Sequence, residues 1–452
     1  MPFASAVPGS QRLVPPSLWR DADFRSLWAG QTASQLGEQA GLIVLPLIAV
    51  LTLNADAAQL GVLRAVGQAP ILLFSLFAGA WVDGWRTRTV MMLADLGRVL
   101  ALSACVLAGL LGGLGLPALL VAAFATGSLS VFFDVGYQAS LVRLVQRHQL
   151  VQGNSALEGS RSAAQTGGAG LGGLLVALLP APIAAGSSAP FFALSFLSIR
   201  RIRHESVPER PHGPRRVWRQ VYEGLRFVGG NPSLRTVGLA SAAFQFFFAA
   251  MMTIYLLFLA RELHLAGTAV ALALAATGPG ALLGSLLAAR LPGRFGYGTV
   301  LVSAAALGDG AMLCVPALHG PAAVTIPALV AVNFVFATFG QLVNVTVMAV
   351  RQAITPEGMQ GRAAATITFA GMGVTPLGSL LGGFLGQEWG LRASLLATAA
   401  GMILSPALMA LSPLARLGRA LPALQDAPPT AARRTYGSLD GCSAPHYNGL
   451  HD

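Results

Sequence analysis

The chain has 452 residues, of which 54% are hydrophobic and only 10% are charged, and its formal net charge is +11. Typical soluble proteins carry about 25% charged residues, so this composition argues against a water-soluble enzyme. The long charge-free runs match a helix that crosses a bilayer, which needs about 20 residues, and they lack the alternation of a membrane β-barrel. We therefore predict an all-α polytopic membrane protein.

Twelve apolar segments follow one another along the chain. We predict transmembrane helices near residues 27–51, 60–82, 89–113, 117–142, 155–179, 182–199, 236–259, 267–289, 299–317, 322–348, 363–386 and 391–414. These segments define an N-terminal tail (1–23), a six-helix bundle (24–199), a linker (200–235), a second six-helix bundle (236–414) and a C-terminal tail (415–452). We expect the C-terminal tail to be disordered, because it is rich in Pro, Ala and Arg and has no periodicity.

The distribution of arginine predicts the orientation in the membrane. All 29 basic residues are arginines, and the odd-numbered loops contain one of them, Arg261. Most of the others lie in the termini, the linker and the even-numbered loops. By the positive-inside rule, both termini and the linker are cytoplasmic. The basic charge is therefore a topology signal and not a nucleic-acid footprint. An arginine-only chain rich in Ala and Gly favours a bacterial source, and hence the bacterial cell membrane.

The linker contains apolar side chains at helical spacing, namely Trp218, Val221, Tyr222 and Leu225, with arginines around them. This pattern predicts an amphipathic helix. The helix lies either at the cytoplasmic lipid surface or packed beneath the bundle.

The two halves of the chain are related by an internal repeat. At an offset of 208 residues, Arg143 falls on Arg351 and Gly170 falls on Gly378. Parallel repeats of six spans are a known transporter organisation, in which the substrate binds between the halves near the middle of the membrane. We therefore predict two pseudo-symmetric six-helix bundles around a shared cavity.

Polar side chains recur on one face of several predicted spans. Charged side chains in the bilayer are costly, so they should face the bundle interior or water. The predicted cavity residues are Gln31, Gln35, Arg64, Gln68 and Gln138 in the first half and Gln245, Gln341 and Asn344 in the second. For any single amide, the alternative is a hydrogen bond that only joins two helices.

Three acidic residues are candidates for coupling transport to protons or to a cationic substrate. Glu38 has no local partner and lies near the middle of the first span, Asp134 lies in the fourth span and Asp309 in the ninth. Burial favours the protonated form of a carboxyl group, which makes such a residue suited to carry a proton.

Two further acids have an arginine three residues away. Asp95 precedes Arg98 in the third span, and Glu158 precedes Arg161 near the cytoplasmic end of the fifth span. Side chains at this spacing are neighbours on a helix. We expect both to be structural ion pairs, with a gating role as the alternative for Glu158 and Arg161.

The loop between the second and third spans reads Gly79-Ala-Trp-Val-Asp83-Gly84-Trp-Arg86-Thr87-Arg88. It resembles the signature loop of the major facilitator superfamily, Gly-x-x-x-Asp-Arg followed by basic residues, with Gly84 in place of the arginine. The resemblance implies a gating loop in which Asp83 pairs with a neighbouring helix to hold the inward gate, together with Arg86 and Arg88.

Motifs spread over about residues 20–415 resemble the drug-efflux branch of that superfamily, which contains bacterial macrolide and enterobactin exporters. They are Gly37-Glu38, Phe132-Phe133-Asp134, Gln138-Ala139, Gly153-Asn154, Arg351-Gln352, Pro356, Gly361-Arg362 and Ser412-Pro413-Leu414. The run Gly168-Ala169-x-x-Gly172-Gly173 is similar to an antiporter motif, with Ala169 in place of its proline. The resemblance implies the major facilitator fold.

We therefore expect a proton-coupled secondary transporter that exports a small amphiphilic compound by alternating access. Phenylalanines on the predicted cavity walls favour a bulky, largely apolar substrate over a sugar or a phosphate; they are Phe246, Phe247, Phe248, Phe334, Phe336 and Phe339. An uptake permease is the alternative within the same fold, because the fold does not set the direction of transport.

Two alternatives from other classes are a membrane enzyme and a non-transporting sensor. The sequence contains no His-Glu-x-x-His, nucleophile elbow or phosphate-cradling loop. We therefore expect no catalytic residue, no metal site and no cofactor. The expected partners are a small-molecule substrate, protons and the lipid bilayer, without nucleic acid, and we expect the chain to be a monomer.

Overall fold

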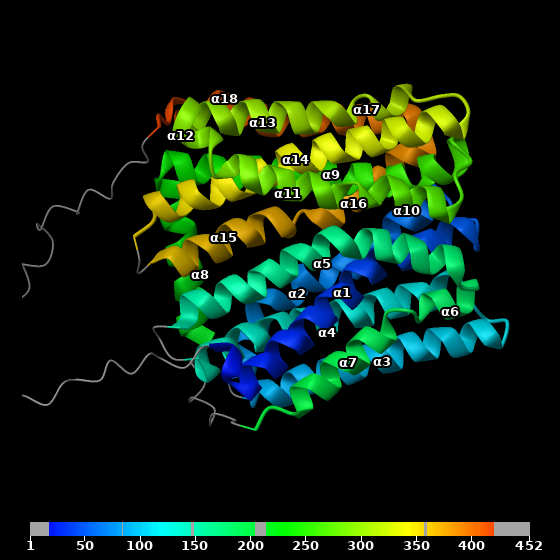
Figure 1. Ribbon diagram of the computed structural model, residues 1–452, viewed down its shortest axis with the longest axis horizontal. Coiled ribbons are helices and arrows are strands. Elements are labelled where there is room, and N and C mark those ends of the chain that lie inside the picture. Colours follow the sequence, from blue (N-terminus) through cyan, green and yellow to red (C-terminus); the bar gives the residue numbers. More distant parts are fainter. Residues whose placement is uncertain (1–17, 84, 146–148, 204–213, 357–358, 420–452) are drawn as a thin grey trace, which may run out of the picture.

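A computed structural model of the chain describes residues 18–83, 85–145, 149–203, 214–356 and 359–419. These residues form helices joined by short loops, without a strand among them. The helices form two bundles, which lie one above the other in Figure 1 with α8 running across one end of both. We call this end the α8 end and the opposite end, which contains the α1–α2 loop, the far end.

The first bundle is built from seven α-helices and a short 3-10 turn. Asp21 caps the first span, since its carboxylate accepts hydrogen bonds from the backbone N–H groups of Asp23 and Phe24. The elements are η1 (Leu18–Arg20), α1 (Ala22–Leu51), α2 (Ala57–Asp83), α3 (Thr87–Leu110), α4 (Leu116–Leu144), α5 (Leu150–Leu178), α6 (Ala181–Ala185) and α7 (Ala189–Arg200).

The second bundle follows α8 (Pro214–Gly230), and Asn231 caps its first helix in the same manner. Its elements are α9 (Pro232–Leu257), η3 (Phe258–Glu262), α10 (Gly267–Ala275), α11 (Thr277–Ala288), α12 (Leu291–Phe295), α13 (Tyr297–Met312), η4 (Val315–Ala317), α14 (Ala322–Ile354), α15 (Gln360–Met372), α16 (Thr375–Glu388), α17 (Leu391–Met402), α18 (Leu404–Ala410) and η6 (Pro413–Arg416).

Three predicted spans of the second bundle are each broken into two helices, and a proline accounts for every break. The helices α10, α15 and α17 end four residues before Pro279, Pro376 and Pro406, respectively. Proline lacks the N–H that would bond the carbonyl four residues earlier, and its ring clashes with that carbonyl. The spans predicted at 267–289, 363–386 and 391–414 are therefore α10/α11, α15/α16 and α17/α18.

The described helices include eleven segments that are long and apolar enough to cross a membrane. The remaining predicted span, α5, has 29 residues but is rich in glycine and polar side chains, and it packs between α1 and α10. Counted together, these segments make the twelve-helix arrangement that the sequence predicts.

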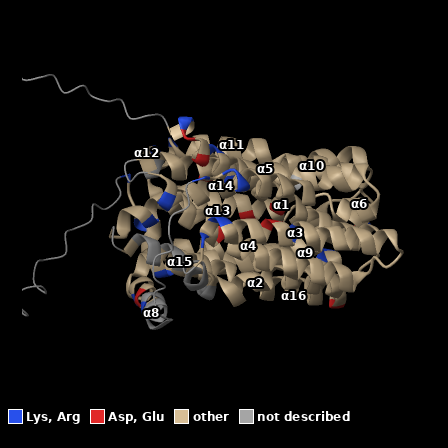
Figure 2. Ribbon diagram, turned by 90° about the horizontal axis from the view of Figure 1, so that it is seen from below, with Lys and Arg blue, Asp and Glu red and all other residues tan. Residues whose placement is uncertain are grey.

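The outer surface of the bundles is apolar. Leu107, Leu286 and Phe384 are 59%, 69% and 60% exposed, and many other leucines share this environment. Such a surface matches contact with lipid tails, which offer apolar side chains the solvent they prefer. Charged residues instead gather at the end that carries α8, α12 and α15, while most of the ribbon is uncharged (Figure 2).

The ends of the bundles differ in detail from the predicted boundaries. The predicted tail at 1–23 overlaps η1 and α1, and Phe24 is fully buried. The predicted tail at 415–452 begins with residues that pack on α13, where the backbone N–H groups of Tyr297 and Gly298 donate to the carbonyls of Gly418 and Leu417. Residues 420–452 lie outside the described part of the chain.

The helix predicted in the linker is α8, and it contacts α9 and α15. Val228 is buried against the second bundle, whereas Tyr222 and Leu225 are 65% and 54% exposed. The side chains of Trp218 and Val221 lie outside the described residues. The C-terminal part of α8 therefore packs beneath the second bundle, while an apolar face next to it stays uncovered.

The two bundles touch most closely at the far end, through small residues. A Cβ atom placed on Gly61 of α2 would lie 2.8 Å from the Cα of Gly383 in α16. A Cβ on Gly173 of α5 would lie 2.7 Å from the Cβ of Ala271 in α10. Only glycine permits such a close approach of two helices. The far end is therefore closed in this structure.

Hydrogen bonds from Arg261 also join the two bundles at the far end, and we call these bonds the Arg261 latch. The guanidinium of Arg261, just after α9, donates to the backbone carbonyls of Asn54 (3.0 Å) and Ala55 (2.7 Å) in the α1–α2 loop. Asn54 adopts a left-handed backbone conformation with φ of 51°, which asparagine tolerates better than most residues. This turn exposes consecutive carbonyls to one arginine.

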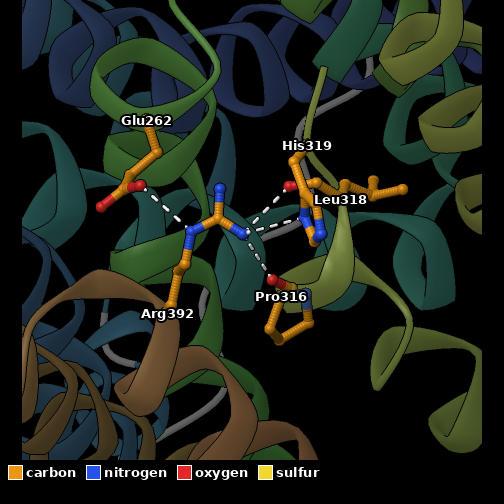
Figure 3. A network of polar contacts seen from close by, with 5 residues as sticks. All are labelled: Glu262, Pro316, Leu318, His319 and Arg392. Atoms are coloured by element: carbon orange, nitrogen blue, oxygen red, sulfur yellow. Dashed lines mark hydrogen bonds and ion pairs between the residues drawn. The ribbon is translucent and has the colours of Figure 1, made fainter.

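Arg392 organises the far end of the second bundle (Figure 3). Its guanidinium lies 3.1 Å from the carboxylate of Glu262 and donates to the carbonyls of Pro316 (2.8 Å) and Leu318 (3.1 Å), with His319 beside it. These partners come from the ends of η3 and η4, whereas Arg392 lies at the start of α17. One side chain thus ties three connections of the bundle together.

Candidate functional site

Polar residues of α1, α4 and α5 meet inside the first bundle and form what we call the N-half cluster: Gln31, Gln35, Glu38, Asp134, Ser160 and Arg161. The amide of Gln35 donates to a carboxylate oxygen of Asp134 at 3.2 Å. The hydroxyl of Ser160 donates to the amide oxygen of Gln31 at 3.1 Å. Three spans are therefore joined through side chains that lipid could not solvate.

Glu38 lies half-buried one turn beyond Gln35 on α1. Its surroundings are the carboxylate of Asp134, the hydroxyl of Ser130 and the guanidinium groups of Arg98 and Arg161. One carboxylate oxygen of Glu38, Oε2, is enclosed and accepts no hydrogen bond from a described residue. Two acids and two arginines thus share one enclosed region, in which a change of protonation alters several interactions at once.

Asp95 and Arg98 form the ion pair expected from their spacing, at 2.6 Å, and both side chains are fully buried. Arg98 also donates to the hydroxyl of Ser130 at 3.2 Å. Its guanidinium lies between the rings of Phe133 and Phe192, 4.6 and 4.3 Å from their centroids, an arrangement that stabilises a desolvated cation. The guanidinium of Arg98 also acts electrostatically on Glu38 and Asp134. Arg98 therefore interacts with the N-half cluster as well as with Asp95.

The second predicted ion pair is absent from the described contacts. Glu158 is exposed, and no ion pair joins it to Arg161. Among the acids near Arg161, Asp134 has a larger electrostatic effect on the guanidinium than Glu158 or Glu38. The buried acid outweighs the exposed one because water screens an exposed charge. Arg161 therefore belongs to the N-half cluster.

The predicted cavity residues of α2 lie on the face that meets the second bundle. The amide oxygen of Gln68 accepts a hydrogen bond of 3.1 Å from the hydroxyl of Ser379 in α16, across the interface between the bundles. Arg64 lies one turn earlier, and its Nε is enclosed without a hydrogen-bond partner among the described residues. Gln138 of α4 is exposed.

A cavity of about 430 Å³ opens within the second bundle, and we call it the C-half cavity. Asp309 of α13, Gln245 of α9 and Asn344 of α14 line it, so three predicted site residues come together. Gln341 does not line it, because it packs against Gly284 of α11. Asp309 is only 5% exposed.

The six phenylalanines predicted on the walls of the shared cavity between the halves do not line the C-half cavity, whereas Phe244, which the sequence did not single out, does. Phe248 and Phe336 stack with Phe244, with centroids 5.3 to 6.5 Å apart, against the core of the second bundle. Helical spacing places an aromatic residue on a face but does not show whether that face meets a cavity or another helix.

The predicted gating loop is described in part. The side chain of Asp83 and all of Gly84 lie outside the described residues. Arg86 is exposed, and Arg88 donates to the carbonyl of Arg200 at 2.7 Å, at the C-terminus of α7. A cation at a helix C-terminus is favourable because of the helix dipole. Arg88 therefore fastens α3 to α7.

Hydroxyl residues supply most of the partners that sequence reasoning missed. Ser130, Ser160 and Ser379 each hydrogen-bond a predicted site residue from a different helix. Serine is common throughout the spans, so its presence alone could not identify these three. The sequence signals for the site came from the larger polar and charged residues, through their recurrence on one helix face and through the motifs around Glu38 and Asp134.

Comparisons with known proteins agree with this architecture. Residues 15–432 match the family model of the transmembrane secretion effectors, a group of major facilitator proteins. The multidrug efflux pump Tap of Mycolicibacterium fortuitum is 28% identical over 388 residues, which cover 84% of this chain and 92% of that protein. Tap of Mycobacterium tuberculosis is 27% identical over 380 residues, covering 80% and 87%.

Solved structures share the fold at lower identity. A bacterial homologue of the iron transporter ferroportin, in an inward-facing state, is similar with a TM-score of 0.68 and 17% identity, covering 87% of this chain and 98% of that one. An inward-facing bacterial homologue of the lysosomal transporter Spinster gives a TM-score of 0.64 and 15% identity, covering 90% and 98%.

Proposed function

Because this chain belongs to the transmembrane secretion effector family of major facilitator transporters, we propose that it exports a small amphiphilic compound across the cell membrane in exchange for protons. The compound is a drug, an antibiotic, a siderophore or another secondary metabolite. The transporter class follows from the family, and the efflux direction is supported by the relatives named multidrug efflux pumps. The α8 end faces the cytoplasm in this proposal.

The observation that carries the proton coupling is the placement of Glu38 beside Asp134 in the N-half cluster. Two carboxyl groups in one enclosed region repel each other when both are charged, which favours a bound proton. Arg98 and Arg161 face the same acids and compete with that proton. Proton binding and release then change the balance of charge between α1, α4 and α5, which is a means of driving a rearrangement.

Alternating access is supported by how the bundles meet. The far end is closed by glycine contacts between α2 and α16 and between α5 and α10, and by the latch from Arg261. In the proposed cycle, the far end opens while the α8 end closes, and the substrate leaves to the exterior.

Transport into everted membrane vesicles tests the function directly. We expect vesicles that contain the protein to accumulate fluorescent dyes or macrolides when a proton gradient is applied, and a protonophore to abolish the accumulation. Glu38→Gln should retain expression and lose proton-driven accumulation. Glu388→Gln removes an exposed carboxylate from the end of α16 and serves as the matched control.

Two outcomes would count against the proposal. If a broad panel of compounds showed no accumulation above empty vesicles, export would be wrong. If Glu38→Gln kept full proton-driven turnover, Glu38 would not be the coupling residue. Uptake by right-side-out vesicles, without accumulation in everted ones, would identify an uptake permease instead.

A further inference from the structure

The C-half cavity lies inside one bundle and is separate from the N-half cluster. Its lining residues all belong to α9, α13, α14, α15 and α18, whereas the N-half cluster is built from α1, α4 and α5. Its volume of about 430 Å³ falls within the range of roughly 300–1,000 Å³ that is typical of small-molecule pockets. The second bundle therefore has room for an organic ligand of its own.

Asp309 is the only carboxylate in the lining of this cavity. Asp309 is buried, with 5% of the residue exposed, and no hydrogen bond or ion pair joins it to another described residue. The arginine that also lines the cavity, Arg351, does not pair with it. A buried carboxylate without a partner is unfavourable. A cationic ligand would supply the missing charge.

The break in the eleventh span lies beside this cavity. The helix α15 ends at Met372, and both Gly371 and Met372 line the cavity. Transporters commonly place the ends of broken helices at their ligand sites. The break does not select the charge of the ligand, because α16 begins at Thr375, whose hydroxyl donates to the carbonyl of Met372. The charge preference of the cavity comes from Asp309.

The rest of the wall is mostly apolar and sets the remaining chemistry of the ligand. Phe244, Met372 and Met409 line the cavity together with the amides of Gln245 and Asn344. Methionine adapts its shape to varied apolar groups, phenylalanine offers a rigid apolar ring face, and the amides offer a few hydrogen bonds. The ligand should thus be an amphiphile with one charged end.

Arg351 limits the charge that the cavity accepts. It lies seven residues beyond Asn344 on α14, about 10 Å along the helix toward the α8 end. Its positive charge opposes a second cationic group at that end of the ligand. A monocation is therefore favoured over a dication.

We propose that the C-half cavity is a binding site for a monocationic amphiphile, such as a quaternary or protonated amine, with its cationic group beside Asp309. This inference rests on the proposed export function and narrows its substrate class. The site lies beside the interface between the bundles, because α9 and α15 also contact α2.

Equilibrium binding to the full chain in lipid nanodiscs tests the site. The probe is radiolabelled tetraphenylphosphonium, a permanent cation without a titratable proton, and the neutral comparator is triphenylphosphine oxide. Asp309→Asn should weaken binding of the cation about 10- to 100-fold, as expected for loss of a charged partner, and change binding of the neutral probe little. Asp309→Glu should retain cation binding, and Glu388→Gln should match the unsubstituted protein.

A second variant tests the cavity without touching the carboxylate. Gly340 lines the cavity, and a Cβ atom there would meet no atom within 4 Å. Gly340→Leu should therefore fill the cavity without disturbing the fold, and weaken binding of both probes. Thermal unfolding of each variant reports whether the bundle is intact.

Three results would overturn the site: no saturable binding of tetraphenylphosphonium, unchanged binding by Asp309→Asn in a folded protein, or unchanged binding by Gly340→Leu. The export function fails separately. If Asp309→Asn binds the cation normally while vesicles still export it, the site is wrong and export stands. If the cation binds beside Asp309 but no compound is transported, export is wrong and the site stands.

Discussion

The amide of Gln35 donates to the carboxylate of Asp134 at 3.2 Å, and this bond links the first span to the fourth inside the first bundle. Each side chain costs free energy if it is left without a partner in a membrane interior. Removing Gln35 therefore affects the fold through Asp134, and the size of the effect reports how strongly the two are coupled.

We predict that Gln35→Leu and Asp134→Ala are coupled in stability, because each removes one partner of this hydrogen bond. Interhelical hydrogen bonds in membrane proteins contribute about 0.5–2 kcal/mol, so the double variant should be less destabilised than the sum of the single variants by about that amount. Unfolding by SDS titration in detergent micelles measures the three free energies. Gln245→Leu combined with Asp134→Ala is the control, because Gln245 lies in the other bundle, and additive values are expected. Additive values for Gln35 would contradict the contact.

A second prediction concerns the buried pair of Asp95 and Arg98, which are 2.6 Å apart and fully enclosed. Arg98→Leu leaves a buried carboxylate unpaired, which costs about 3–5 kcal/mol of stability when one partner of a buried pair is removed. Replacing both with leucine removes both charges, so the double variant should recover much of the loss. The same SDS titration applies. Equal destabilisation of the single and double variants would show that the pair is not what stabilises this region.

The breaks in the second bundle show what the sequence could predict and what it missed. Apolar run length predicts twelve spans because the thickness of lipid sets the length of a helix. The breaks were missed although Pro279, Pro376 and Pro406 mark each of them. Proline alone does not decide the outcome, since α1 and α2 continue through Pro46 and Pro70. In a membrane helix the backbone groups freed by proline are satisfied by neighbouring helices, hydroxyl side chains or local backbone adjustment, and which of these is available cannot be read from one segment.

The sequence could not predict which side chains meet between helices, for a related reason. Gln341 and Asn344 share a stripe of α14, yet one packs on α11 and the other lines the C-half cavity. Periodicity gives the face of a helix, whereas the neighbour on that face depends on how all the helices pack. The spacing of Asp95 and Arg98 predicts their ion pair correctly, and both side chains are fully buried. The same spacing on α5 does not pair Glu158 with Arg161, because Glu158 is exposed and the buried acid Asp134 of α4 lies near Arg161.

A third prediction concerns closure of the far end, where Gly61 of α2 meets Gly383 of α16. A side chain at Gly61 would overlap the backbone of α16, so Gly61→Val should hold the far end apart and strongly reduce transport in vesicles. A cysteine at Ala55, which is buried in the α1–α2 loop, should at the same time react faster with a membrane-impermeant maleimide, in a chain whose exposed Cys314 is replaced by serine. Gly159→Val is the control, because a Cβ there meets nothing within 4 Å. Unchanged transport and labelling in Gly61→Val would argue against closure by this contact.

Arg392 makes both an ion pair with Glu262 and hydrogen bonds to backbone carbonyls, so substitutions can compare how much each contributes to stability. The pair with Glu262 is more than one-third exposed on both sides, and exposed pairs contribute about 0–1 kcal/mol. The bonds from Arg392 to the carbonyls of Pro316 and Leu318 are partly buried, and hydrogen bonds to a charged group contribute about 1.5–3 kcal/mol. Removing the arginine should therefore cost more than removing the acid.

We thus predict that Glu262→Gln lowers the free energy of unfolding by less than about 1 kcal/mol, and that Arg392→Gln lowers it by about 1–3 kcal/mol. High salt should weaken the stability of the unsubstituted protein only slightly, since screening acts on the exposed pair and little on the carbonyl contacts. SDS titration at low and high salt gives both quantities. If Glu262→Gln were as destabilising as Arg392→Gln, the carboxylate and not the backbone carbonyls would hold η3, η4 and α17 together.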